Sequence, residues 1–207
     1  MSELENMFGA ATTANVSDVL GSLGVMHPDI KPAVPGFRML GRAFTVKAYP
    51  GSIITVHKAL VEASPGDLIV VDGEGDVGAG ALLGEIMALE CQTKGFAGIA
   101  IDGAVRDVDG LRELGFPVFA RGVTPRVGTN RRLGRTQVPV SCGGIVVHPG
   151  DIILGDDNGV VAVPQNEERG LAAALNALLA KEEKLMEDIK HGIFLAEGLG
   201  FQDSLKA

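Results

Sequence analysis

The sequence predicts an α/β fold built from mixed sheets, flanking helices and a long C-terminal helix. Short apolar runs alternate with helical patterns over residues 67–122, and this order is typical of a parallel sheet section. Several short β runs separated by turn signals follow over residues 138–164, which favours antiparallel or mixed pairing. Residues 166–190 then form one long amphipathic pattern rich in charges, which predicts a C-terminal helical arm.

The first part of the chain predicts two helices and one strand. Residues 13–23 have the apolar spacing of a helix, and either Thr13 or Asn15 can cap its first turn. Residues 36–48 alternate imperfectly between apolar and polar side chains and are expected to form a strand. Residues 51–63 predict a second helix, which the following Ser-Pro-Gly ends because proline cannot continue a helix.

The middle of the chain alternates strands and helices. The expected elements are a strand at 67–72, a glycine-rich loop at 73–83, a helix at 84–95, a strand at 98–102, a helix at 106–115 and a strand at 117–122. Gly115 is expected to end the second of these helices. Because parallel strands need crossover connections, this order predicts that the three strands pair in parallel.

Length and composition predict one domain and exclude some classes of function. The 207 residues, 46% of them hydrophobic, can bury one large core, so residues 1–207 are expected to form a single domain. The formal net charge of −8 argues against a nucleic-acid partner, because phosphate binding needs a concentrated basic surface. The densest basic stretch lies among glycine and proline without aromatic neighbours, and we expect a solvated or subunit-facing loop at Arg126, Arg131, Arg132 and Arg135.

The cysteines and the N-terminus indicate a reducing compartment. Cys91 and Cys142 are too few for a disulfide framework and lack zinc-site spacing, so we expect buried, reduced thiols. Residues 1–7 are polar and acidic, unlike a signal peptide. The apolar runs are far shorter than the roughly 20 residues that a membrane span needs. A soluble cytoplasmic protein without a membrane partner is therefore expected.

The loop at residues 73–78 matches the pattern GxGxxG, and two interpretations of it are open. It follows a buried strand and precedes a helix, as a dinucleotide fingerprint requires. Against a nucleotide, Glu74 and Asp76 place two carboxylates where a pyrophosphate would bind, and the helix is expected to begin only near Gly84. We favour a flexible surface loop over a nucleotide site.

Residues 84–87 are expected to form the N-terminus of a helix. The first backbone amides of a helix are unpaired and carry partial positive charge, so such an end binds a carboxylate or phosphate readily. Gly84 lets a ligand approach the backbone closely. Glu85 lies in the first turn, where an acidic residue is also an ordinary helix-stabilising choice, and both interpretations of it stay open.

The pair Arg106-Asp107 follows a buried strand and opens a short helix. Ligands gather at this edge of open α/β sheets. Arg106 offers a fixed cationic fork for a carboxylate or an enolate oxygen, and Asp107 offers a hard oxygen ligand for Mg²⁺ or Mn²⁺. The alternative is purely structural, with Asp107 capping the helix and Arg106 paired with Asp109 or Glu113.

Both β–α junctions share one edge of the predicted parallel sheet, so the helix end at 84–87 and the Arg106-Asp107 pair are expected to face each other. A single carboxylate leaves Mg²⁺ with several waters, and Glu85 or Asp102 could hold them. Anion-binding amides, a cation and a metal ligand together suit a 2-oxo acid, whose carbonyl oxygen becomes an enolate.

These residues give the sequence its resemblance to a known family. The stretch 84–118 carries Glu85, twenty intervening residues and then Arg106-Asp107, and it resembles the RraA-like family. This family includes class II 4-hydroxy-4-methyl-2-oxoglutarate/4-carboxy-4-hydroxy-2-oxoadipate aldolases and regulators of ribonuclease E activity. The resemblance covers nearly the whole chain. It implies a swivelling β/β/α domain, assembled as a homotrimer or homohexamer with sites between subunits.

The resemblance also implies a role for each site residue. Arg106 would contact the carbonyl oxygen, Asp107 would bind the divalent metal and Glu85 would hold a metal-bound water, and these are the expected catalytic residues. The pyruvyl part of the substrate would bind along the backbone of Gly84, Glu85, Ile86 and Met87. In the aldolases a C-terminal glutamate of the neighbouring subunit reaches the metal waters, and Glu182 or Glu183 are candidates for it.

The implied function is that of a lyase. With Mg²⁺ or Mn²⁺ it would cleave a 4-hydroxy-2-oxo diacid to pyruvate, with oxaloacetate decarboxylation as a side activity. The aldolase pattern expects an acid at the third residue after the metal-binding aspartate, where this chain has Gly110, with Asp109 one position away. This departure concerns the choice of substrate more than the metal site. The alternative within the family is a non-catalytic regulator that binds and inhibits a ribonuclease.

Overall fold

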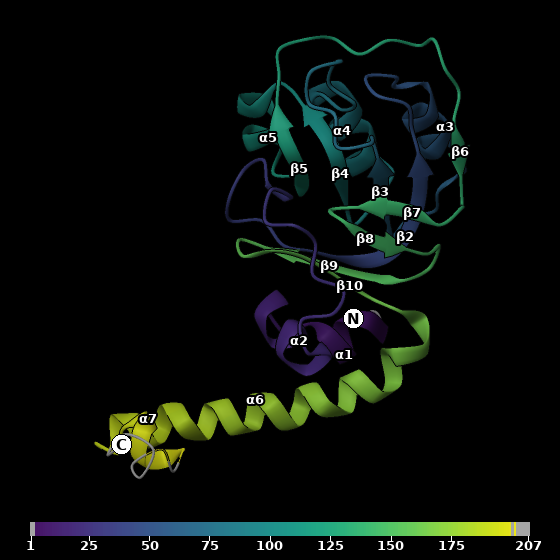
Figure 1. Ribbon diagram of the computed structural model, residues 1–207. Coiled ribbons are helices and arrows are strands. Elements are labelled where there is room, and N and C mark those ends of the chain that lie inside the picture. The colour runs from purple at the N-terminus through teal and green to yellow at the C-terminus, as the bar shows by residue number, and fades with distance from the viewer. Residues whose placement is uncertain (1–2, 200, 202–207) are drawn as a thin grey trace.

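The computed structural model describes residues 3–199 and residue 201, and it shows a mixed α/β fold (Figure 1). The helices are α1 (Glu3–Phe8), α2 (Thr13–Leu20), α3 (Ile54–Glu62), α4 (Glu85–Thr93), α5 (Val108–Leu114), α6 (Glu168–Lys190) and α7 (Leu195–Gly198). The strands are β1 (Lys31–Pro32), β2 (Met39–Lys47), β3 (Asp67–Asp72), β4 (Gly98–Val105), β5 (Val118–Val123), β6 (Arg135–Thr136), β7 (Val140–Cys142), β8 (Ile145–Val147), β9 (Ile152–Asp156) and β10 (Gly159–Val163). Helices α1 and α2 lie between the sheet and α6, which extends well beyond the body (Figure 1).

The main sheet combines the predicted parallel section with antiparallel strands. Its order is β1-β5-β4-β3-β2-β9-β10, and β6 pairs with β2 off this path. Strands β2, β3, β4 and β5 run parallel to one another. Strand β9 pairs antiparallel with β2, and β10 returns antiparallel along β9. Because the four central strands run parallel, their carboxyl ends meet at one edge of the sheet, where ligands commonly bind.

Apolar side chains bury both faces of the main sheet. On one face α3, α4 and α5 contribute Leu60, Cys91 and Leu111 to the cluster that covers β3 and β4. On the opposite face the β7–β8 hairpin contributes Val140 and Val147 to a second cluster. Burial of one such side chain stabilises the fold by about 1.5–3 kcal/mol, so these clusters hold the carboxyl ends of the strands in place.

Helix α2 begins at the predicted residue, but its cap is neither Thr13 nor Asn15. Thr12 Oγ1 accepts a hydrogen bond from Asn15 N at 3.2 Å, and Asn15 Oδ1 accepts one from Thr12 N at 3.0 Å. This capping box satisfies two backbone donors at once and sets the start of the helix directly after Thr12.

Strand β4 continues further than predicted. The sequence predicts its end at Asp102, whereas the strand runs on to Val105. A β-bulge between Ile101 and Ala104 lets β4 keep pairing with β5 after a shift of register. As a result Asp102 lies inside the strand, and Arg106 stands directly after its end.

Helix α6 confirms the helix predicted at 166–190. It follows a short 3₁₀ turn (Gln165–Glu167) and buries Leu171 and Leu175 in a cluster with α1, α2 and the β9–β10 hairpin. Its later turns run past the body of the molecule (Figure 1). The short helices α1 and α7 were not predicted. None of the described helices is long and apolar enough to cross a membrane.

Both cysteines are free and buried, as predicted. Burial, together with the neighbouring carboxylate of Glu90, raises the pKa of Cys91 to about 12. Burial and the nearby Asp102 also raise the pKa of Cys142. Both thiols are therefore protonated at neutral pH and are poor nucleophiles.

Candidate active site

The Arg106-Asp107 pair stands where β4 ends and α5 begins. Asp107 occupies the N-cap position of α5, and its carbonyl oxygen accepts a hydrogen bond from Leu111 N at 2.9 Å. Its φ is 60°, in the left-handed region that non-glycine residues rarely adopt. Such a conformation costs on the order of 1–3 kcal/mol, and conformations of this kind cluster at functional sites.

The carboxylate of Asp107 is turned toward α4 and does not cap α5. Its Oδ2 accepts a hydrogen bond from Glu85 N at 3.3 Å and lies 3.4 Å from Arg106 Nε. Asp109 pairs with Arg112, not with Arg106. The two contacts that the structural interpretation predicted are therefore absent from the described residues, since Asp107 does not cap α5 with its side chain and Arg106 pairs with Asp107.

Helix α4 presents an open N-terminus to this carboxylate. The N-cap residue, Gly84, has no side chain to bind the first amides, and the first intrahelical bond runs from Ala88 N to Gly84 O. The amides of Ile86 and Met87 consequently have no acceptor among the described residues. A Cβ on Gly84 would lie 2.6 Å from Asp107 Oδ2, so this close approach requires glycine. The two β–α junctions meet, as the sequence predicts.

The side chain of Glu85 lies over the first turns of α5. A Cβ on Gly110 would collide with Oε2 and Cδ of Glu85. Gly110 is the position where the aldolase pattern expects an acid, and here the Glu85 carboxylate fills the space that such a side chain would take. The Glu85 carboxylate thus lies beside Gly110, about one helical turn along α5 from Asp107.

A pocket of about 60 Å³, which we call the helix-end pocket, opens between the start of α4 and the Arg106-Asp107 pair. The predicted residues that line it are Gly84, Ile86, Met87, Arg106 and Asp107. The lining residues that were not predicted are Ile53, Ala81, Leu83, Val127 and Gly128. Because these additional residues are small or apolar, they suit the hydrocarbon part of a small acid.

A second pocket of about 300 Å³ shares Arg106 and Asp107 with the first. It lies at the carboxyl end of β5, and we call it the strand-end pocket. Its other lining residues are Val108, Asp109, Val123, Thr124 and Pro125. A substrate longer than pyruvate therefore finds room next to the Arg106-Asp107 pair.

The loop at residues 124–134 borders both pockets, although the sequence did not place it in the site. Ala81 N donates a hydrogen bond to Arg126 O at 2.9 Å, and Ile53 N donates one to Thr129 O at 2.8 Å. A Cβ on Gly128 would lie 2.5 Å from Ala81 O, so only glycine permits this contact. That glycine was the available sequence signal, since glycine often marks a close approach of two backbones.

Asp102 does not hold water for a metal at Asp107, which corrects one prediction. Its Oδ1 accepts a hydrogen bond from Arg121 Nε at 2.5 Å, and its Oδ2 accepts one from Gly143 N at 2.8 Å. Because β4 continues past Asp102, this side chain is buried on the face that the β7–β8 hairpin covers. It stabilises the packing of that hairpin and has no part in the candidate site.

In the glycine-rich loop, a carboxylate of the loop accepts hydrogen bonds from the loop's own backbone amides. Asp76 Oδ1 accepts hydrogen bonds from Gly78 N at 2.9 Å and Ala79 N at 2.6 Å. A pyrophosphate would need such amides, and α4 begins only after Gly84, so the structure does not support a dinucleotide site. Residues 74–79 are exposed or half-buried, as expected of a surface loop, whereas residues 80–83, which lead into α4, are buried.

The donor set fits a largely hydrated hard cation. The described residues contain no group of three or more His, Cys, Asp or Glu side chains that could hold a metal. The Asp107 side chain is 42% exposed, so its carboxylate is open to solvent, and Glu85 lies nearby. Mg²⁺ is commonly held by one or two carboxylates together with water and substrate oxygens, and Mn²⁺ shares its preference for oxygen ligands.

The two C-terminal candidates differ in their contacts. Glu182 Oε2 accepts a hydrogen bond from Asn15 Nδ2 at 2.9 Å, so this carboxylate is engaged within its own chain. Glu183 is exposed. Both belong to α6, on the opposite side of the main sheet from α4 and α5 (Figure 1). Either residue could therefore reach an Arg106-Asp107 pair only in another copy of the chain.

Comparison with known proteins places the chain among aldolases and their relatives. Residues 13–162 match the family model RraA-like, described as Aldolase/RraA. A protein of Halalkalibacterium halodurans, provisionally named as a 4-hydroxy-4-methyl-2-oxoglutarate aldolase, is 37% identical over 85% of this chain and 83% of its own length. The 4-hydroxy-4-methyl-2-oxoglutarate aldolase of Thermus thermophilus is 34% identical over 75% of this chain and 93% of its own length.

A solved structure shares the fold. RraAS2 of Streptomyces coelicolor, described as an unusual member of the RNase ES inhibitor RraA protein family, has a TM-score of 0.79 and 29% sequence identity to this chain. The match covers 90% of this chain and 98% of that structure. This similarity confirms the fold class predicted from the sequence.

Proposed function

We propose a function from the premise that this chain belongs to the RraA-like family, whose model it matches over residues 13–162. The proposed activity is that of a class II carbon–carbon lyase that depends on Mg²⁺ or Mn²⁺. The substrate is a 4-hydroxy-2-oxo diacid of the 4-hydroxy-4-methyl-2-oxoglutarate type, and one product is pyruvate. Oxaloacetate decarboxylation is expected as a side activity, because it forms the same pyruvate enolate.

One observation carries this proposal. A single pocket of about 60 Å³ is bordered by the Asp107 carboxylate, the Arg106 guanidinium and the open amide end of α4. The backbone of Asp107 is strained, with a φ of 60°. The pocket thus combines a hard oxygen ligand, a cation and an anion-binding helix end. A 2-oxo acid carries the matching groups, namely a carboxylate beside a carbonyl oxygen that becomes negative during the reaction.

The residues of the helix-end pocket have separate roles. The amides of Ile86 and Met87 bind the substrate carboxylate at the positive end of α4. Arg106 stabilises the negative charge that develops on the 2-oxo oxygen. Asp107 would hold the divalent metal, which when bound supplies a Lewis acid that polarises the same oxygen. Positive charge is thereby placed where the enolate forms.

Glu85 assists proton transfer in the proposed reaction. The 4-hydroxyl group loses its proton as the bond between C3 and C4 breaks, and C4 becomes a carbonyl carbon. The electron pair of that bond moves into the pyruvate enolate. Glu85, held over Gly110, orients the water that accepts this proton and later delivers one to C3. One proton leaves the hydroxyl group and one enters C3, so the reaction is balanced.

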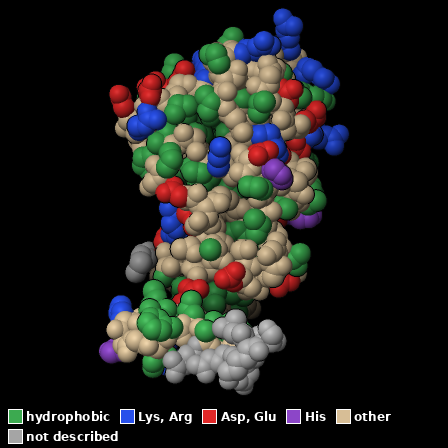
Figure 2. All heavy atoms as spheres, turned by 60° about the vertical axis from the view of Figure 1, so that its left-hand side comes forward, with side chains coloured by type: hydrophobic (Ala, Val, Ile, Leu, Met, Phe, Trp, Pro, Cys, Tyr) green, Lys and Arg blue, Asp and Glu red, His purple; other side chains and the backbone are tan. Residues whose placement is uncertain are grey.

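We also propose that the protein works as a homo-oligomer, either a trimer or a hexamer, with sites near subunit interfaces. The end of the α6–α7 arm carries exposed apolar side chains, a feature that commonly marks an interaction surface. They are Met186, Ile189, Ile193, Phe194 and Leu195. Figure 2 shows hydrophobic side chains gathered there, next to the grey atoms at the lower end of the molecule. The exposed Glu183 could reach a neighbouring site from such an arm.

The second candidate function is that of a non-catalytic regulator that binds and inhibits a ribonuclease. The structural similarity to RraAS2 of Streptomyces coelicolor favours it. A regulator of this kind would act by surface contact, so inhibition would survive substitutions at Arg106 and Asp107. Measuring inhibition of a partner nuclease by these variants distinguishes the two functions.

A pyruvate-release assay tests the lyase proposal. The wild-type chain is given 4-hydroxy-4-methyl-2-oxoglutarate or oxaloacetate, with Mg²⁺, with Mn²⁺ or with a chelator. We expect metal-stimulated release of pyruvate that Asp107→Asn lowers at least a hundredfold, because the variant loses the charge that holds the metal.

Glu113→Gln is the matched control. Glu113 also belongs to α5, its side chain is exposed and it lines neither pocket. Its substitution should change pyruvate release by less than twofold. Release that needs no metal, or full activity in Asp107→Asn, would contradict the proposal.

A further inference from the structure

The loop at residues 124–134 is held rigidly against the candidate site. Thr124 N donates a hydrogen bond to Val105 O at 2.9 Å, which ties the loop to the end of β4. Further along, Thr129 N donates to Gly51 O at 2.7 Å. Between these two points, a Cβ on Gly80 would lie 2.7 Å from Val127 O, so the two backbones are in close contact. Side chains on this segment are therefore presented from a fixed backbone.

Arg126 lies between the two pockets along the chain. The residues before it, Thr124 and Pro125, line the strand-end pocket. The residues after it, Val127 and Gly128, line the helix-end pocket. The Arg126 side chain is exposed, and within the described part of the chain it forms no ion pair.

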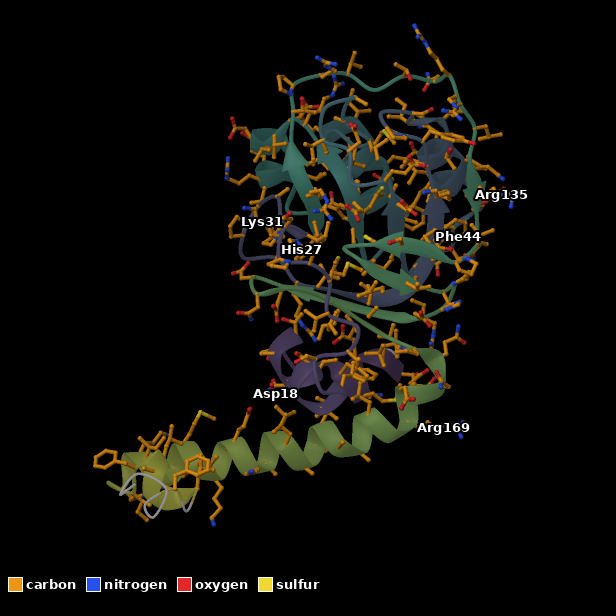
Figure 3. The ribbon with its side chains drawn as sticks, viewed as in Figure 1. Asp18, His27, Lys31, Phe44, Arg135 and Arg169 are labelled. Carbon is orange, nitrogen blue, oxygen red and sulfur yellow. The ribbon has the colours of Figure 1, made fainter. Side chains whose placement is uncertain are left out.

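The other arginines of this basic stretch have different surroundings. The guanidinium of Arg132 stacks 3.6 Å from the ring centroid of Tyr49, so it serves to anchor the loop. Arg135 belongs to β6, which Figure 3 shows at the edge of the molecule beside α3, far from β5 and α5. Arg131 is exposed and lines neither pocket. None of the four lines either pocket, but Arg126 is the one whose neighbours along the chain do so on both sides.

Of the cations around the strand-end pocket, Arg126 is the one without a carboxylate partner in the described structure. The Glu85 carboxylate over Gly110 adds one negative charge on the α5 side. Arg106 pairs with Asp107, and Arg112 pairs with Asp109. These two pairs are close to neutral overall, and a divalent metal at Asp107 would add positive charge. Arg126 adds a further positive charge without a carboxylate partner in the described structure. A ligand with a second negative charge matches this arrangement better than one with a single carboxylate.

We propose that Arg126 is a specificity-determining residue that binds the distal carboxylate of a 2-oxo diacid. The inference rests on the proposed function and deepens it by assigning the residue that selects diacids. The 2-oxo carboxylate occupies the helix-end pocket, and the remainder of the substrate extends into the strand-end pocket toward Arg126. A guanidinium suits this role because its planar fork can form two parallel hydrogen bonds to one carboxylate.

Paired ligands of equal chain length test this inference. Titration calorimetry with Mg²⁺ present compares 2-oxoglutarate with 2-oxopentanoate, which has a methyl group in place of the distal carboxylate. We expect the wild-type chain to bind 2-oxoglutarate more tightly, and Arg126→Gln to weaken that binding roughly ten- to a hundredfold. Binding of 2-oxopentanoate should change by less than twofold. Arg126→Lys keeps the charge but loses the fork, so it should retain part of the preference.

Arg131→Gln is the matched control, because it removes the same charge from the same loop at a position whose neighbours along the chain line neither pocket. It should leave the binding of both acids within twofold of wild type. Equal weakening of both ligands by Arg126→Gln, or an unchanged preference for 2-oxoglutarate, would overturn the inference.

A kinetic measurement separates this inference from the proposed function. With 4-hydroxy-4-methyl-2-oxoglutarate as substrate, Arg126→Gln should raise KM roughly ten- to a hundredfold while competitive inhibition by pyruvate stays unchanged. A wild-type chain that binds 2-oxoglutarate selectively but releases no pyruvate would sink the lyase proposal and leave Arg126 as a diacid-binding residue. Pyruvate release by the wild-type chain, together with no effect of Arg126→Gln, would support the lyase proposal and overturn the role of Arg126.

Discussion

The Glu85 carboxylate occupies the space that a side chain at position 110 would fill. This arrangement accounts for glycine at 110, where the aldolase pattern has an acid. A side chain at 110 would collide with the Glu85 carboxylate. Asp109 cannot replace the expected acid, because its side chain is 96% exposed and pairs with Arg112. In the proposed reaction, the acid that orients water lies at the start of α4, and Gly110 leaves free the space that its carboxylate occupies.

Substituting alanine for Gly110 tests this placement. Alanine normally stabilises a helix by roughly 1 kcal/mol relative to glycine, so α5 should remain folded. The added methyl group should displace Glu85 and lower kcat for pyruvate release by tenfold or more, with Mn²⁺ affinity unchanged. Gly170→Ala on α6 is the control, because a Cβ there meets nothing within 4 Å. A Gly110→Ala variant with wild-type kcat would show that Glu85 need not lie over α5.

Individual site residues were predictable where they stand directly after a strand or at the start of a helix. Arg106, Asp107 and Gly84 follow a strand or open a helix, and the structure brings them together as expected. Asp102 was misplaced because the β-bulge carries β4 past it, and no side-chain pattern marks a bulge. Val127 was missed because a small apolar residue in a loop carries no chemical signal of its own.

At the scale of elements, helix α2 depends on a carboxylate from a distant strand end. Asp156, at the end of β9, accepts hydrogen bonds from Thr13 N at 2.8 Å and Thr13 Oγ1 at 2.6 Å. Partial burial opposes ionisation of Asp156, but hydrogen bonds from Thr13 and Asn158 outweigh it and hold its pKa below the ordinary value. The ionised carboxylate thus ties α2 to the β9–β10 hairpin.

Replacing Asp156 with asparagine should destabilise the protein at neutral pH by about 1 kcal/mol, the usual size of a helix-cap interaction. Since the folded-state pKa is lowered, ionised Asp156 stabilises the fold above its unfolded pKa, and this contribution is lost as pH falls through the folded value. The wild-type advantage should therefore shrink below about pH 4. Urea unfolding at several pH values measures the difference in the free energy of unfolding between the wild type and the variant. Substitution of the exposed Asp18 by asparagine is the control. An advantage that persists in acid would contradict this account.

The order of elements was largely predictable, and their ends were not. Alternation of apolar strands with short helices over residues 67–122 predicted the parallel section, because burial on both faces of a sheet demands that pattern. The cap at Thr12 was displaced by one residue because several polar residues at 12–15 could serve equally well. Helix α1 was missed because its six residues are too few to show a repeating apolar pattern, although Leu4, Met7 and Phe8 pack in one cluster.

At the scale of the whole molecule, α6 was predictable as a helix, but its partner was not. Its first turns bury Leu171 and Leu175, whereas Met186 and Ile189 near its end are exposed in the described structure. A sequence shows that a helix is amphipathic without showing whether its own chain or another copy covers it. In the proposed oligomer, another copy of the chain covers these exposed residues.

Changing Phe194 to aspartate tests the role of the arm. Phe194 is 67% exposed on the arm, and a charge there would be buried at the proposed interface. We expect light scattering after size-exclusion chromatography to find a trimer or hexamer for the wild type and a smaller species for the variant. Val61→Asp on α3, where the valine is 79% exposed, is the control and should keep the wild-type mass. A monomeric wild type would contradict the proposed assembly.

The central claim is that Asp107 holds a divalent metal beside the bound 2-oxo acid. Titration with Mn²⁺, followed by electron paramagnetic resonance with and without pyruvate, tests it most directly. We predict one bound Mn²⁺ per chain, a spectrum that changes when pyruvate is added, and loss of both in Asp107→Asn but not in Glu113→Gln. Mn²⁺ binding of unchanged affinity in Asp107→Asn would contradict the claim.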